Sequence, residues 1–309
     1  MHLSARLTAV AIATSLLLAA CGGGGGDDDD DNNNAPPAQT RLGNTVALTA
    51  SGKLVSFDRA SPGTQVSSAN VTGLAQGETL LGIDRRPADG KLYAVGSAGS
   101  VYELNPLTGA ASLKATLNAV AGDDNAYQGL SGTSFAIDFN PSVDRLRLVS
   151  NTGQNLRINV DTGATTTDTP ITPAGATVTA GAYTNGFTGT SRTRLYVIDA
   201  GAGRVYLQQP ANDGTLDAGV ALGVQGAAAN GFDIDPRTNA GYAALTVDGV
   251  TSLYRIDLEA TDNAATRVGA IDAGGEAIRG IALSAVDAPR AFGLTADNRL
   301  VAFDPASPN

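Results

Sequence analysis

The sequence predicts an all-β protein: a β-propeller of about six four-stranded blades, with five or seven also compatible, after a disordered N-terminal tether. Three observations lead to this fold class. Short runs of aliphatic, β-branched or aromatic residues recur about every 50 residues, a period typical of propeller blades. Gly, Asn, Asp and Pro separate the runs, as expected of turns between strands. No segment after residue 40 keeps a helical periodicity.

The repeat is clearest in the runs expected to form the second strand of each unit. These runs are Thr45–Leu48, Leu92–Val95, Leu146–Val149, Leu195–Ile198, Gly241–Ala244 and Ala291–Leu294. Shorter inner runs precede some of them, at Gly82–Asp84, Ala136–Asp138, Gly231–Asp233 and Gly280–Ala282. A third and a weaker fourth run follow, for example Val101–Leu104 and Ala111–Leu113. One four-stranded sheet cannot bury both of its faces, whereas a ring of such sheets can.

The two ends of the repeat leave the closure of the ring open. The first unit lacks an obvious inner strand, and the last unit lacks an outer one. A β-helix is the weaker alternative, because its repeat is shorter than this one.

Residues 1–20 have the pattern of a secretory signal peptide. Arg6 precedes an apolar stretch, Leu7–Ala20, that is too short to span a bilayer comfortably. The stretch ends in Leu18–Cys21, which resembles the bacterial lipobox, where the Cys thiol is lipidated and the peptide is cut just before it. We therefore expect lipidation of Cys21. The alternative is an ordinary secretory signal followed by a chance cysteine.

Residues 21–40 are expected to be the lipidated Cys and its tether, and residues 41–309 the propeller. The tether contains five Gly, then Asp27–Asp31, and shows no apolar pattern, so it should be disordered. Residue 22 is Gly, not Asp, and by resemblance to the lipoprotein sorting rule this favours the outer membrane. We expect an exported monomer, anchored by lipid to the bacterial envelope and facing the periplasm or the cell surface.

The composition excludes several classes of chemistry. The single His is His2 and the single Cys is Cys21, so the body of the chain has neither imidazole nor thiol. This rules out Ser-His-Asp and Cys-His catalysis and His/Cys metal sites there. The net charge of −10 argues against nucleic acid as a partner. Aromatic residues are 5% and Trp is absent, so stacking surfaces for sugars or bases are scarce.

Asp84, Asp138 and Asp233 are the first candidate site. They occupy equivalent places at the ends of three predicted inner strands, and inner strands line the channel of a propeller. Three carboxylates there could hold Ca²⁺ or a cationic ligand, since Ca²⁺ takes six to eight oxygens. The alternative, which we favour at this point, is that each Asp caps its own turn. No cofactor is predicted; any metal would have to be a hard ion that prefers oxygen ligands, and Ca²⁺ is one that the residues allow.

Arg147 is the second candidate, because Val, Tyr or Phe fills its place in the other repeats. It could face the channel and bind an anion, with Asn151 and Gln154 nearby on the following turn. The alternative, which we favour, is a structural ion pair between blades, since an unpaired buried charge is costly.

Long motifs in the chain resemble those of a bacterial family, the domain of unknown function 4394. They are Ser131–Pro141, Asp144–Arg157 and Ala182–Asn185, and the resemblance covers nearly all of residues 42–304. It implies exported or lipid-anchored bacterial proteins with a propeller-like β fold. It implies no assigned activity and supplies no catalytic residues.

A binding or interaction module with a protein or small-ligand partner is the function we favour, since a rigid ring on a lipid tether suits display. The alternative is an enzyme, an Asp-based or Ca²⁺-dependent hydrolase such as a lactonase, with its site in the channel. That alternative rests on fold-level analogy alone. A glycosidase is the least supported of these enzymes, because the chain has only four Glu and no Trp. A purely structural envelope protein is a third reading.

Overall fold

The computed structural model describes residues 41–224, 228–284, 291–294 and 300–303. These residues lie within the larger of two compact units of the chain, Gln39–Asn309. The predicted signal peptide, Cys21 and the tether lie outside the described residues. Within the described part of the chain, no helix is both long and apolar enough to cross a membrane.

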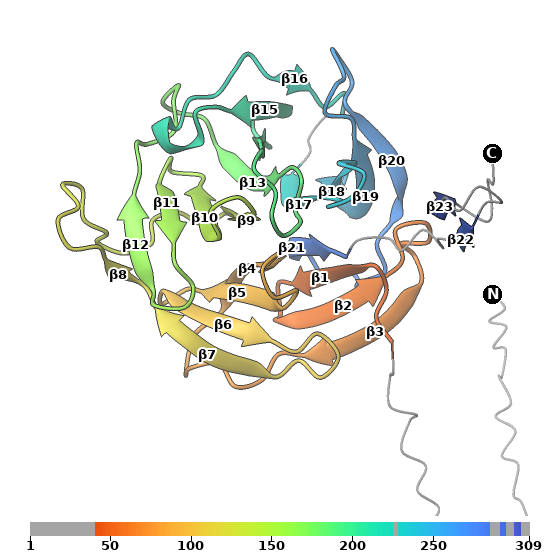
Figure 1. The fold of residues 1–309 in the computed structure, drawn as a ribbon, viewed down its shortest axis with the longest axis horizontal. Coiled ribbons are helices and arrows are strands. Elements are labelled where there is room, and N and C mark those ends of the chain that lie inside the picture. The colour runs from red at the N-terminus through yellow and green to blue at the C-terminus, as the bar shows by residue number, and fades with distance from the viewer. Residues whose placement is uncertain (1–40, 225–227, 285–290, 295–299, 304–309) are drawn as a thin grey trace, which may run out of the picture. The chain divides into compact units, whose positions relative to one another are not determined.

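The strands form five antiparallel sheets arranged as the blades of a propeller (Figure 1). Blade 1 contains β21 (Ile278–Leu283), β1 (Thr45–Thr49), β2 (Lys53–Phe57) and β3 (Gln65–Asn70). Blade 2 contains β4 (Leu80–Arg85), β5 (Leu92–Gly96), β6 (Ser100–Leu104) and β7 (Ala111–Thr116). Blade 3 contains β9 (Phe135–Asn140), β10 (Arg145–Ser150), β11 (Asn155–Ile158) and β12 (Ala164–Thr167), with β8 (Asn118–Ala119) added parallel at its outer edge.

Blade 4 contains β13 (Val178–Tyr183), β14 (Leu195–Asp199), β15 (Arg204–Gln208) and β16 (Val220–Ala221). Blade 5 contains β17 (Ala228–Ile234), β18 (Gly241–Val247), β19 (Val250–Ile256) and β20 (Ala265–Ala270). A short 3₁₀ helix, η1 (Ala211–Asp213), follows β15. The first strand named in each blade is its inner strand, and these five strands neighbour one another in the order β4, β9, β13, β17, β21 and back to β4.

The propeller prediction is confirmed at five blades, one of the numbers compatible with the repeat. The ring closes because β21, from the end of the chain, pairs with β1 and becomes the missing inner strand of the first unit. Closure in this way gives blade 1 the same four-stranded order as the other blades. The sixth predicted run, Ala291–Leu294, is β22, which pairs with β23 (Leu300–Phe303) in a separate two-stranded sheet.

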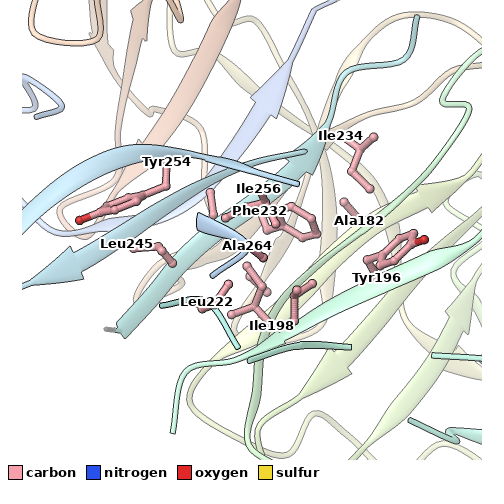
Figure 2. Packing of buried hydrophobic residues seen from close by; sticks show 13 residues of the cluster. Ala182, Tyr196, Ile198, Leu222, Phe232, Ile234, Leu245, Tyr254, Ile256 and Ala264 are labelled. Atoms are coloured by element: carbon pink, nitrogen blue, oxygen red, sulfur yellow. The ribbon is translucent and has the colours of Figure 1, made fainter. Parts of the chain in front are cut away.

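A hydrophobic cluster fills each boundary between adjacent blades in the described ring. Figure 2 shows the cluster between blades 4 and 5. Within β1, Val46 and Leu48 pack toward blade 2, while Ala47 packs toward blade 5. Both faces of the strand are therefore covered, which explains why it is apolar throughout instead of alternating.

The inner strands approach one another closely around the axis. A Cβ atom placed on Gly231 of β17 would lie 2.7 Å from the backbone nitrogen of Ile281 in β21. A Cβ on Gly280 of β21 would lie 3.2 Å from the backbone nitrogen of Ile83 in β4. Glycine at these places thus lets neighbouring backbones meet. Gly82 of β4 and Gly231 of β17 each stand two residues before a candidate Asp. The close packing of the inner strands at these glycines therefore also brings the carboxylates of those strands together.

Candidate functional site: three carboxylates at the channel mouth

The strand register shows that the three candidate aspartates occupy equivalent positions. Asp84 of β4 lies opposite Tyr93, Asp138 of β9 opposite Arg147, and Asp233 of β17 opposite Tyr242. The same position carries alanine in the other two inner strands, Ala182 in β13 and Ala282 in β21. The ring therefore has five equivalent places, and three of them hold a carboxylate.

The structure brings these three carboxylates together. One oxygen from each of Asp84, Asp138 and Asp233 lies within 4.8 Å of the others. The three residues are only 5%, 5% and 7% exposed, respectively. A cavity of about 290 Å³ opens onto them and is walled by the last residues of inner strands, including Arg85 and Tyr183, and by the segments that follow these strands.

Each carboxylate also accepts a hydrogen bond from the next blade. The donors are the backbone N–H groups of Phe139 to Asp84 (2.7 Å), of Tyr183 to Asp138 (2.9 Å) and of Leu283 to Asp233 (2.6 Å). Asp84 and Asp233 accept a second bond from the residue that follows them, so the turn-capping role expected from sequence is present for these two. Asp138 differs, because only its Oδ1 accepts a hydrogen bond from the described residues.

The surroundings favour the neutral form of these acids. Burial raises the pKa of Asp84 and of Asp138 well above the usual value, and the charges of neighbouring carboxylates raise it further. Burial also raises the pKa of Asp233, to about 7. Arg85 lines the same cavity, and its own burial lowers its pKa. The cluster therefore holds protons near neutral pH unless another cation compensates its charge.

The spacing of the oxygens suits a hard cation. Ca²⁺ binds oxygen at about 2.3–2.6 Å, so ligands on opposite sides of one ion stand roughly 4.6–5.2 Å apart. Three oxygens within 4.8 Å of one another share a centre at most about 2.8 Å from each, so shifts of a few tenths of an ångström bring all three to a single Ca²⁺ ion. The cavity leaves space for water or for oxygen atoms of a ligand to complete the coordination.

Arg147 does not join this site. Although it lies opposite Asp138 in the sheet, its guanidinium donates to Asn155 Oδ1 (2.8 Å) and Asp168 Oδ2 (2.7 Å) in its own blade. It also donates to Asn212 Oδ1 (2.6 Å) and to the hydroxyl of Tyr183 (3.2 Å) in blade 4. The channel-facing alternative for Arg147 is therefore wrong, and the structural role favoured from the sequence is what the structure shows: Arg147 is 2% exposed, forms an ion pair and joins two blades.

Asn151 and Gln154 lie at the other end of blade 3. Ser150, next to Asn151, pairs with Phe135 at the start of β9, whereas Asp138 is near its end. Asn151 Oδ1 accepts bonds from the N–H groups of residues 133 and 134, and Gln154 binds the backbone of residues 129 and 131. Both residues hold the connection that enters β9, so grouping them with the aspartates was wrong.

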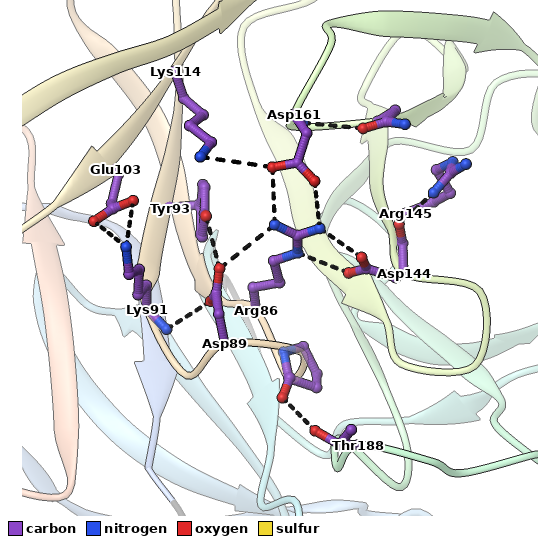
Figure 3. Close-up of polar contacts among 12 residues, drawn as sticks. Arg86, Asp89, Lys91, Tyr93, Glu103, Lys114, Asp144, Arg145, Asp161 and Thr188 are labelled. Atoms are coloured by element: carbon purple, nitrogen blue, oxygen red, sulfur yellow. Dashed lines mark hydrogen bonds and ion pairs between the residues drawn. The ribbon is translucent and has the colours of Figure 1, made fainter.

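Arg86 is a wall residue of the cavity that the sequence did not single out. It donates to Asp144 (2.6 and 2.8 Å) and Asp161 (2.8 and 3.1 Å) of blade 3, and its guanidinium lies 5.8 Å from the ring centre of Tyr93 (Figure 3). This network joins blades 2 and 3 beside the site. Its position two residues after Asp84 is the signal that could have revealed it.

The fold and site define the chain as a five-bladed β-propeller with a buried carboxylate cluster at one mouth of its central channel. More particularly, it belongs to the family described as domain of unknown function DUF4394, which matches residues 53–282. The expected resemblance is thus confirmed. No curated protein sequence matches the chain.

Solved structures with a similar fold are distant relatives in sequence. A structural genomics protein of unknown function from Bacteroides thetaiotaomicron is 17% identical, with 77% of this chain and 68% of that chain covered and a TM-score of 0.44. A putative 6-phosphogluconolactonase from Bacteroides uniformis is 12% identical, with 84% and 88% covered and a TM-score of 0.41. BamB from Moraxella catarrhalis is 13% identical, with 88% and 71% covered and a TM-score of 0.32.

Proposed function

We propose that this propeller is a binding module whose channel mouth takes a divalent cation, Ca²⁺, on Asp84, Asp138 and Asp233. The observation that carries the proposal is the convergence of three buried carboxylates whose oxygens lie within 4.8 Å of one another at a cavity. Buried carboxylates are expensive unless they are paired or bind a metal. Here the described structure offers the cluster no salt bridge.

Asp138 supports the proposal independently of the spacing. Asp138 is only 5% exposed and lines the cavity. Its Oδ2 atom accepts no hydrogen bond from the described residues. This oxygen is open to the cavity and has no protein partner in the described part of the chain. A cation at the cluster would supply that partner and would reduce the repulsion among the three acids. Its remaining coordination positions would face the cavity, where an oxygen-bearing small ligand or a protein side chain could bind.

Thermal unfolding of the purified protein with Ca²⁺ or with EDTA tests the proposal. We expect Ca²⁺ at 100 times its Kd to stabilise the fold by about 2.7 kcal/mol. Asp138→Asn keeps an oxygen that can accept the Tyr183 N–H, so the variant should fold but lose most of the Ca²⁺ response. Asp199→Asn is the matched control, because Asp199 is a buried acid that accepts bonds from Thr177 and Ala202 in its own blade. This control should unfold at a lower temperature and keep the response.

Mass spectrometry of the native protein reports whether it carries a bound metal ion. Titration with Mg²⁺ shows whether the site distinguishes Ca²⁺ from Mg²⁺. Wild-type protein that shows no shift with Ca²⁺ would refute the cation site. A shift that persists in Asp138→Asn would place the ion elsewhere.

For the location, we propose an exported protein held in the bacterial envelope by lipid on Cys21. The support is the lipobox-like Leu18–Cys21 run after a signal-peptide pattern. Several acyl chains anchor a protein stably, whereas one does so marginally. Labelling of growing cells with an alkyne fatty acid should mark the wild-type protein and leave Cys21→Ser unmarked. Release of unlabelled wild-type protein to the soluble periplasm would contradict the anchor.

The same cavity supports hydrolysis as a second candidate function. Carboxylates that face a cavity can transfer protons, and a bound Ca²⁺ can polarise a carbonyl oxygen. A panel of lactones and esters separates the candidates. Turnover that is lost in Asp233→Asn, with folding retained, would favour the enzyme, whereas Ca²⁺ binding without turnover would favour the binding module.

A further inference from the structure

A second and larger groove lies at the boundary between blades 4 and 5. Its volume is about 920 Å³, within the range of small-molecule sites. It is lined by the β13–β14 connection, the start of β14, Gln209 after β15, the turn after β17, and the end of β19 with the segment that follows it. The turn after β9 of blade 3 lines it as well. The carboxylate cavity has a different set of lining residues, so the two are separate features.

Thr184, which lines the groove, stands where blade 2 has Arg86. The backbone N–H of Arg86 donates to the carbonyl of Lys91 (3.0 Å), and that of Thr184 donates to the carbonyl of Arg194 (2.9 Å), so the two residues are structurally equivalent. The long side chain of Arg86 fills the boundary between blades 2 and 3 (Figure 3). Thr184 is short, and its hydroxyl is engaged within its own hairpin by the N–H of Arg194 (2.9 Å).

Blade 5, which faces Thr184, also differs from its counterpart, blade 3. Asp144, which binds Arg86, has its equivalent in Asn239 of blade 5: both have positive φ, 51° and 56°, and both donate from N–H to the carbonyl four residues earlier. Asn239 exchanges hydrogen bonds with Asn185 instead of binding an arginine. The boundary has therefore lost the arginine and one of the two acids that bind it. The place of the second acid, Asp161, is held by Glu259, because each donates its N–H to the side chain of the residue two positions earlier.

Tyr196 presents a hydroxyl to this space. Its counterpart Tyr93 donates to Asp89 Oδ2 (2.9 Å), whereas the hydroxyl of Tyr196 has no hydrogen bond to any described residue. Tyr196 is 9% exposed and lines the groove. Figure 2 shows its ring at the margin of the cluster with the hydroxyl directed away from the apolar side chains. The hydroxyl is open to the groove and can donate to a ligand oxygen there.

Three arginines line the same groove, namely Arg192, Arg194 and Arg255. All three are exposed, and none forms an ion pair within the described residues. The acids of the groove are Asp257 and Glu259, so the lining has a small excess of positive charge on a chain whose net charge is −10. Guanidinium groups bind carboxylate and phosphate through paired hydrogen bonds.

We propose that the groove between blades 4 and 5 binds a small ligand that carries a carboxylate or phosphate group. The arginines contact the anion, and the Tyr196 hydroxyl donates a hydrogen bond to one of its oxygens. This site does not depend on the cation site, and either proposal can fail alone.

Calorimetric titration of the purified protein with inorganic phosphate, and separately with malonate, tests the proposal. The titrations are made at constant ionic strength on protein freed of metal by a chelating resin, so that neither a cation at the channel nor a soluble carboxylate chelator contributes. We expect saturable binding of at least one of the two anions. Arg194→Gln should weaken this binding about tenfold, as expected when a hydrogen bond to a charged group is lost.

Two further variants make the outcome decisive. Tyr196→Phe should weaken binding about tenfold while the melting temperature stays unchanged, because the hydroxyl has no protein partner to lose. Arg267→Gln is the matched control: it removes the same charge from an exposed site on β20, outside the groove, and should bind like wild type. Absence of binding by both anions, or equal binding by all variants, would overturn the proposal.

Discussion

The backbone N–H of Phe139 donates a 2.7 Å hydrogen bond to Oδ2 of Asp84, which lies on the neighbouring blade. Inner strands of adjacent blades share no backbone ladder in the described sheets, so this bond ties two separate sheets near the axis. Asp138 and Asp233 make the equivalent bond at their own boundaries. The carboxylates thus hold the ring together as well as lining its channel, and variants at these positions must be chosen to keep that bond.

Gly231→Ala should destabilise the ring by about 1–3 kcal/mol, the usual cost of overpacking. The new Cβ would lie 2.7 Å from the backbone nitrogen of Ile281 and 2.9 Å from the Cα of Gly280, and backbone atoms cannot swing away as a flexible side chain can. Urea unfolding measures the effect. Gly63→Ala is the control, since the nearest atom to its Cβ would be 3.6 Å away. Equal stability of the two variants would contradict the close approach of inner strands.

The free energy of unfolding in EDTA should fall between pH 5 and pH 8. Burial raises the pKa of Asp233 to about 7 and the pKa of Asp84 and Asp138 well above the usual value, so the folded state binds these protons more tightly than the unfolded state. Their stabilising contribution is complete below about pH 4 and is lost as the pH rises through the folded-state values. The other charged groups around the cluster are Arg59, Arg85, Arg86 and Asp235.

Denaturant unfolding at pH 5, 6.5 and 8 checks this pH dependence. Each carboxyl group that titrates contributes a slope of up to about 1.4 kcal/mol per pH unit. Acids with a lowered pKa, such as Asp199, act in the opposite sense and lose their contribution only in strong acid. Asp233→Asn should flatten the profile between pH 5 and 8. A wild-type profile that rises over this range would show that the cluster is not buried as described.

Arg147→Gln should cost about 3 kcal/mol of folding stability, because it breaks a buried ion pair and leaves Asn212 without its charged donor. Arg157→Gln is the matched control: Arg157 binds the same acid, Asp168, but its side chain is 35% exposed. That variant should cost less than about 1 kcal/mol. Both should retain the wild-type response to Ca²⁺. A lost Ca²⁺ response in Arg147→Gln alone would return Arg147 to the channel site.

Tyr93→Phe and Tyr196→Phe should differ in stability although the two tyrosines occupy equivalent places. Tyr93→Phe removes a hydrogen bond to Asp89 and should cost about 0.5–1.5 kcal/mol. Tyr196→Phe removes a hydroxyl that no described residue binds, so without added anion its stability should stay within about 0.5 kcal/mol of wild type. Thermal unfolding in anion-free buffer checks the pair. An equal loss in both variants would mean that Tyr196 has a protein partner.

The repeat, the all-β class and the equivalence of Asp84, Asp138 and Asp233 could all be read from the sequence. These features depend on local periodicity and turn residues, which neighbouring residues along the chain encode. The direction of the Arg147 side chain could not be read in this way. Its partners Tyr183 and Asn212 belong to blade 4, and nothing near Arg147 in the chain identifies them.

The groove at blades 4 and 5 is a second feature that the sequence alone could not predict. Thr184 in the place of Arg86 is an ordinary substitution when the repeats are aligned. Its effect on the groove is visible only in the folded ring, where Asn239 lies opposite Thr184 and the Tyr196 hydroxyl has no partner among the described residues. The comparison of repeats could have flagged the position, but not the space that it opens.

The sequence by itself determined that this chain builds repeated four-stranded units with a carboxylate at the same place in three inner strands. The tertiary structure decided that five units close the ring, that β21 completes the first of them, and that the three carboxylates meet at one point. The reason is physical. Strand formation depends on local sequence pattern, whereas blade number and the meeting of distant side chains depend on how closely the inner strands pack around the axis.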